Sequence, residues 1–206
     1  MNSDKDATAI LVDSNYLGPV ALFAGMQSLS TILIDIRQPF RKSTWQNRCR
    51  IAGANGPVLL TVPIEGGRGT RKILKDVRIS YEDRWQHVHW NSICSAYRKS
   101  AYFEYYEYRF RPFYEKKTEF LADLDIELMD VCLKILALEC EMISPDEAAH
   151  LPPSDNSGSN NFTIEKKMVP YYQVFREKHG FIDGMSIIDL IFNLGPQAKE
   201  YLQQLK

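Results

Sequence analysis

Hydrophobic and polar positions follow a strand-like pattern in the first part of the chain and change to helical spacing after Tyr81. The short apolar runs at 9–13 and 31–36 are separated by a turn and a compact apolar stretch at 20–29. This order predicts a β–loop–α–β unit, and a crossover of that length favours parallel pairing of its two strands.

A hairpin is predicted next, because RCRIA and PVLLTVPI flank Ala54-Asn55-Gly56. Asn-Gly tolerates positive φ and is a strong short-range signal for a tight antiparallel turn. The other predicted elements are strands at 75–80 and 168–175, helices at 83–99, 102–116 (interrupted near Pro112), 119–138 and 185–195, and a last helix with Pro196 near its first turn. In the helix at 119–138, leucines recur every three or four residues, and Asp123, Asp125, Glu127 and Asp130 are predicted to lie largely off this apolar stripe.

Together these elements predict an α/β fold: a small mixed sheet with an N-terminal β-α-β unit and hairpin, followed by a helical segment and a C-terminal helical return. A length of 206 residues suits one core, so we expect a single domain over 1–206. Residues 144–161 are rich in Ser, Asn, Asp and Pro, without hydrophobic periodicity, which predicts a flexible linker.

The composition predicts a cytoplasmic protein. No apolar run approaches about 18 residues, so no membrane span is expected. The first residues carry acids before their short apolar run, unlike a secretory signal peptide. The four cysteines form no CxxC pair, which favours reduced, structural thiols.

Positive charge is concentrated in one part of the chain, although the net charge is −1. Residues 36–75 carry nine Lys or Arg and one acid, Glu65. Within them, the segment 41–50 (RKSTWQNRCR) combines guanidinium groups with amides and hydroxyls, a set that suits a phosphate or carboxylate ligand. The alternative is a solvated basic strand edge, because Lys and Arg also protect edges from aggregation.

Two further patterns carry weaker signals. His87 and His89 would share a face only on a strand, and the surrounding pattern is helical, so no metal site is predicted. The aromatic run 97–114 includes arginines and could stack on RNA, but its spacing favours core packing. Phosphate-binding and hydrolase motifs such as GxGxxG, GxxxxGK[ST] and GxSxG are absent, and no cofactor is predicted.

The chain resembles the WbqC-like family found in bacterial surface-polysaccharide gene clusters. The matching stretches are RKSTWQNRCRIAGANGPVLLTVPI, DVRIS and W-x3-HW-x2-I-x2-AYRKSAYF, with a further match in MSIIDLIFNLGPQA near the end. The resemblance implies a role in O-antigen biosynthesis, such as transfer of an acyl or aminoacyl group, for example glycine, to a sugar intermediate.

Carried over by this resemblance, the predicted site residues fall into two groups. His89, Asn47, Tyr97 and Asp189 are assigned to catalysis, and Arg41, Trp45, Arg48 and Ser186 to substrate binding. His89 would deprotonate the attacking amine or hydroxyl, Asn47 would orient an amide or sugar hydroxyl, and the arginines would hold the anion. For Ser186 and Asp189 a structural alternative stays open, in which Ser186 caps the helix 187–194 and Asp189 strengthens its first turn.

Two function classes follow from this sequence. The first is an enzyme that acts on a small anionic substrate, such as a nucleotide sugar. The second is a non-catalytic subunit that docks onto polysaccharide-biosynthesis proteins through an exposed apolar patch. Nucleic acid is not expected as a partner, since the chain has no overall positive charge.

Overall fold

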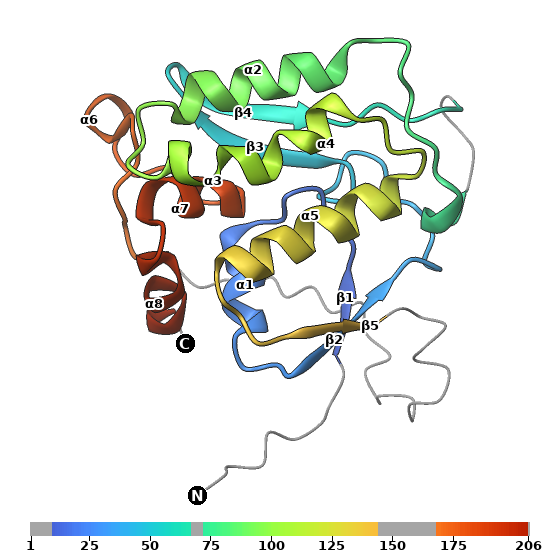
Figure 1. The fold of residues 1–206 in the computed structure, drawn as a ribbon, viewed down its shortest axis with the longest axis horizontal. Helices are drawn as coiled ribbons and strands as arrows, with labels where there is room; N and C mark the ends of the chain where they lie inside the picture. The colour runs from blue at the N-terminus through green and yellow to red at the C-terminus, as the bar shows by residue number, and fades with distance from the viewer. Residues whose placement is uncertain (1–9, 67–71, 144–167, 206) are drawn as a thin grey trace, which may run out of the picture.

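Two small sheets carry the strands of the computed structural model, which describes residues 10–66, 72–143 and 168–205 (Figure 1). β1 (Ile10–Asp13), β2 (Thr31–Asp35) and β5 (Glu141–Ile143) form a parallel sheet with β2 at its centre. β3 (Arg48–Gly53) and β4 (Gly56–Thr61) form a separate antiparallel hairpin. The predicted α/β class is therefore confirmed, with the strands divided between two sheets.

Helices separate and cover these sheets. Figure 1 shows α2 along the hairpin, α5 between the hairpin and the parallel sheet, and α7 and α8 to one side, near α1. The helices are α1 (Val20–Met26), α2 (Trp85–Tyr97), α3 (Phe103–Phe110), α4 (Pro112–Glu115), α5 (Leu121–Ile135), α6 (Arg176–His179), α7 (Ile187–Leu194) and α8 (Gln197–Gln204), with a 3-10 turn η1 at Leu74–Asp76. In the described part of the chain, no helix has the length and apolar character needed to cross a membrane.

The core centres on α7, which is buried along nearly its whole length. The Phe192 ring lies 5.1–5.4 Å, centroid to centroid, from the rings of Tyr97, Phe103 and Phe110. Burial of one such side chain contributes about 1.5–3 kcal/mol, and each aromatic pair adds about 0.5–1.5 kcal/mol. These contacts fix the C-terminal helical return, which was predicted, onto α2 and α3.

Gly195 ends α7 for a steric reason. Its φ is +53°, and a Cβ at this position would lie 2.5 Å from the Tyr102 ring. Only glycine satisfies both conditions. The predicted helix end is therefore confirmed, and Pro196 precedes α8 as expected.

The turn after β1 joins distant parts of the chain. Residues 14–18 are buried, and the Ser14 hydroxyl donates to the Asp125 carboxylate of α5 at 2.9 Å. At the other end of the turn, the backbone N–H of Ile187 donates to the carbonyl of Gly18 at 2.9 Å. Asp125 is completely buried, so its prediction as a residue off the apolar stripe is wrong.

Three other sequence predictions need correction or lie beyond the described residues. The strand predicted at 75–80 is wrong: η1 covers its start, and only isolated bridges join Ile79 to Ile64 and Arg78 to Phe120. The strand predicted at 168–175 is also wrong, because the described residues there belong to no strand. The predicted linker at 144–161 lies outside the described residues.

Candidate functional site

The loop that precedes β3 is held by its own amide side chains. The Gln46 Oε1 accepts from the backbone N–H of Arg41 at 2.7 Å, and the Asn47 Oδ1 accepts from that of Ser43 at 3.1 Å. The Asn47 Nδ2 donates to the carbonyl of Val62 at 3.1 Å. Both amides are buried, so Asn47 lies inside the loop and orients its backbone.

This loop and the hairpin form a basic depression of about 170 Å³. We call it the basic depression; it is lined by Ser43, Thr44, Trp45, Arg48, Cys49, Arg50 and Leu59. Arg48 is half-buried, and its buried Nε has no hydrogen-bond partner among the described residues. No carboxylate within the described ranges forms an ion pair with Arg48 or Arg50. Two guanidinium groups are thus available to an anion beside the Trp45 ring.

Arg41 has a partner of its own. Its guanidinium forms an ion pair with Asp13, at the carboxyl end of β1, and donates to Gln38 at 3.2 Å. Gln38 in turn donates to Asp13 at 2.9 Å. The structure therefore places the Arg41 guanidinium at the edge of the parallel sheet, and Arg41 is not among the residues that line the basic depression.

His89 lies in a buried hydrogen-bond network. Its Nδ1 is 2.9 Å from the hydroxyl of Tyr16, which also lies 2.9 Å from that of Tyr114. His89 is only 4% exposed, and burial lowers its pKa to about 4, although a hydrogen bond with the Thr61 backbone opposes the shift. The imidazole is therefore neutral at pH 7, and it lines neither the basic depression nor any other pocket described here.

The network lies behind the wall of the basic depression. Cys49 lines that depression and lies close enough to Tyr16 and Tyr114 that a thiolate there would raise the pKa of both hydroxyls. Burial raises the pKa of the Cys49 thiol, with a further contribution from Asp125, so the thiolate is disfavoured.

His87, the other member of the HxH pair, is exposed on α2 and contacts Asn91 at 2.9 Å. The two imidazoles thus face different surroundings.

A second buried network surrounds Asp189. One carboxylate oxygen accepts from the Tyr171 hydroxyl at 2.6 Å and from Gln173 at 2.9 Å. Burial raises the pKa of Asp189, while hydrogen bonds from Tyr171, Gln173 and Tyr97 lower it. The Tyr97 hydroxyl also accepts from the backbone N–H of Ala52 at 3.2 Å. Tyr97 and Asp189 therefore lie together, and they join α2, α7 and β3.

Ser186 occupies the N-cap position of α7, but its hydroxyl makes no capping hydrogen bond. The Oγ donates instead to the carbonyl of Leu17 at 2.6 Å. The capping alternative for Ser186 is therefore wrong, and its side chain ties α7 to the turn after β1.

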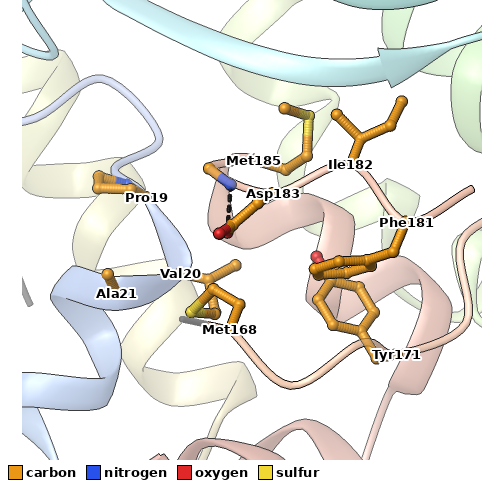
Figure 2. Close-up of a pocket in the computed structure, with 10 residues that line it drawn as sticks. Pro19, Val20, Ala21, Met168, Tyr171, Phe181, Ile182, Asp183 and Met185 are labelled. Atoms are coloured by element: carbon orange, nitrogen blue, oxygen red, sulfur yellow. Dashed lines mark hydrogen bonds between the residues drawn. The ribbon is translucent and has the colours of Figure 1, made fainter. Parts of the chain in front are cut away.

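Figure 2 shows the cavity beside this network, where the Met168, Tyr171 and Phe181 side chains meet those of Val20 and Met185. Its volume is about 30 Å³, which suits one water molecule and no larger ligand. The Asp183 carboxylate at its rim accepts a hydrogen bond from the backbone N–H of Gly184 at 2.6 Å. This cavity is a packing defect in a mainly apolar wall.

The structure thus brings Trp45 and Arg48 together at a surface and places the other predicted residues elsewhere. Sequence reasoning missed Tyr16, Tyr114, Tyr171 and Gln173, the partners of the two buried networks. Tyr16 lies in the turn after a predicted strand, and a tyrosine in such a turn gives no signal that distinguishes a buried hydroxyl from an exposed one.

Comparisons with known proteins agree with the motif resemblance. Residues 14–160 match the model of the WbqC-like protein family. The uncharacterized protein Rv1507c of Mycobacterium tuberculosis is 25% identical over 224 residues, covering 94% of this chain and 96% of that protein. No solved structure matches.

Proposed function

This chain belongs to the WbqC-like protein family, and we propose that it binds an anionic sugar intermediate of bacterial surface-polysaccharide biosynthesis in the basic depression. The observation that carries this proposal is Arg48, whose buried Nε lacks a partner in the described structure. An unpaired buried donor costs about 1–3 kcal/mol, and a phosphate or carboxylate would remove that cost.

The remaining lining suits a sugar. Ser43 supplies an exposed hydroxyl, Arg50 adds a second guanidinium, and the half-buried Trp45 offers an apolar ring face. A volume of about 170 Å³ lies below the roughly 300–1,000 Å³ of typical small-molecule sites. The depression is therefore matched to the charged end of a ligand and one adjacent ring.

Binding is favoured over catalysis by the lining residues. None of the described residues in the basic depression carries an imidazole or a carboxylate, and the Cys49 thiol is held protonated. Transfer of an acyl or aminoacyl group, the finer role implied by the resemblance, would need a base that abstracts a proton from the nucleophile. His89 does not meet this need, because its ring is buried and hydrogen-bonded.

A non-catalytic docking subunit is the second candidate. It is favoured by the internal contacts of Asn47, His89, Tyr97 and Asp189, which serve packing as that role requires. Leu59 on β4 is 53% exposed and lies at the margin of the basic depression. A docking partner would cover this residue together with the guanidinium groups.

Isothermal titration with sugar 1-phosphates and uronic acids tests the proposal. We expect Arg48→Ala to weaken binding at least about tenfold, the size of one charge-assisted contact, while Arg109→Ala on α3 leaves binding unchanged. Equal binding by the wild type and Arg48→Ala would refute the site. Mass analysis of the same mixtures with an activated glycine donor would detect an acylated sugar, which the binding role does not produce.

A further inference from the structure

A second depression lies between α2, the hairpin tip and the segment before α6. We call it the α2 depression; its lining includes Asn91, Ser95, Arg98, Lys99, Val174 and Phe175. Its volume is about 510 Å³, three times that of the basic depression and within the usual range for small-molecule sites.

Its two walls differ in chemistry. Asn91 and Ser95 lie one helical turn apart on α2, and Arg98 and Lys99 follow directly after its end; together they form the polar side of the depression. The half-buried Val174 and Phe175 form the apolar side. A ligand that fills this space would meet hydrogen-bond donors and positive charge on one side and a ring on the other.

Hydrogen bonds hold the helix that follows the apolar side against the hairpin tip. Lys178 Nζ donates to the carbonyl of Ala54 at 2.8 Å, and the His179 Nε2 lies 2.9 Å from the same oxygen. These contacts join α6 to the hairpin tip, and Ala54 itself lines the depression. A preformed cavity of this kind spares a ligand the cost of ordering its site.

The charge of the rim is positive. No carboxylate in the described structure forms an ion pair with Arg98 or Lys99. Burial raises the pKa of the neighbouring Cys94 thiol, while the positive charges of Arg98 and Arg111 lower it and Glu107 raises it. Cations at a helix C-terminus also compensate the helix dipole, so their charge alone does not indicate a ligand. Their position beside a cavity with an apolar wall is what indicates a ligand.

We propose that the α2 depression binds a nucleotide, with its phosphates on Arg98 and Lys99 and its base against Phe175. Guanidinium and ammonium groups are the usual phosphate ligands, and an aromatic side chain offers a stacking surface to any base. The Asn91 amide and the Ser95 hydroxyl lie on the same helix face and can orient the sugar or the base. This inference does not depend on the ligand of the basic depression.

The test measures binding of UDP, ADP, uridine and inorganic pyrophosphate to the full chain by isothermal titration. We expect UDP and ADP to bind to the wild type. The double variant R98Q/K99Q should bind both nucleotides roughly tenfold or more weakly. The charge-matched control K116Q/K117Q alters two exposed lysines outside this lining and should bind like the wild type. Phe175→Ala should weaken the binding of UDP and ADP and leave the binding of pyrophosphate unchanged.

Four results would overturn the proposal. If no nucleotide binds at millimolar concentration, the proposal is wrong. If K116Q/K117Q loses as much nucleotide affinity as R98Q/K99Q, the effect comes from overall charge and not from this depression. If Arg48→Ala loses nucleotide affinity and R98Q/K99Q does not, the nucleotide binds in the basic depression instead. Pyrophosphate that binds as tightly as UDP shows that the apolar wall makes no contact. Circular dichroism of each variant confirms that it is folded.

Discussion

His89 should make the protein less stable as the pH falls from 7 to 5. Its pKa is lowered from 6.5 to about 4 in the folded protein, so the unfolded chain binds the proton more tightly. The stabilisation is complete above pH 6.5 and is lost as the pH falls toward 4. A shift of this size corresponds to about 3 kcal/mol, of which about 2 kcal/mol disappears between pH 7 and pH 5.

Buried carboxyl groups contribute with the opposite sign. Burial raises the pKa of Asp125 and of Asp189, so the folded protein binds their protons more tightly and gains stability as the pH falls through those values. The pH dependence of the unfolding free energy of the wild type therefore combines the contributions of His89 and of the buried carboxyl groups. The difference in unfolding free energy between the wild type and His89→Gln isolates the imidazole, because glutamine does not titrate and can accept from Tyr16.

Urea unfolding at pH 7 and pH 5, followed by tryptophan fluorescence, measures that difference. We expect the unfolding free energy of the wild type, relative to that of His89→Gln, to be about 2 kcal/mol lower at pH 5 than at pH 7. His87→Gln is the matched control, because it makes the same substitution at an exposed histidine of the same helix. A difference between the wild type and His89→Gln that is the same at both pH values would show that His89 is not held neutral by burial.

Three further substitutions probe the packing. Tyr16→Phe removes a hydroxyl shared by two buried partners and should cost about 1–3 kcal/mol in urea unfolding, whereas an effect below about 0.5 kcal/mol would show that the network is hydrated. Gly195→Ala combines backbone strain with a clash against Tyr102 and should lower Tm far more than Gly56→Ala, where φ is +108° but a Cβ meets no atom within 4 Å. Asp189→Ala leaves two buried donors unpaired and should cost roughly 2–4 kcal/mol by calorimetry; an unchanged Tm would contradict the hydrogen bonds described for it.

Local patterns predicted the elements that depend on local physics. The β1–α1–β2 unit, the hairpin at Gly56 and the stop at Gly195 follow from apolar spacing and from glycine conformation. β5 was missed because it has only three residues, which gain strand structure from the edge of β2. The segment 168–175 shows the reverse case, since its side chains bind Asp189 while its backbone joins no sheet.

The sequence does not tell which motif residues reach a surface, because such residues can be fixed by packing as well as by chemistry. Arg48 and Trp45 lie at a surface depression, as their assignment to binding requires. His89 and Asn47 carry the same sequence signal, yet both are buried and hydrogen-bonded to groups far along the chain. Sequence spacing does not reveal which partner such a side chain will meet, so it does not separate these two outcomes.

The buried turn after β1 also has a consequence for how the chain folds. Ser14 and Asp125 are 111 residues apart, and Leu17 and Ser186 are 169 residues apart, so these contacts close very large loops. Long-range contacts of this kind slow folding, because the entropy of closing the loop is lost before the contact forms. During synthesis the turn after the first strand leaves the ribosome early but stays incomplete until α7 has emerged. A chain shortened before Ser186 would therefore leave this turn unsealed, with the apolar surface of α1 that contacts α7 exposed to aggregation.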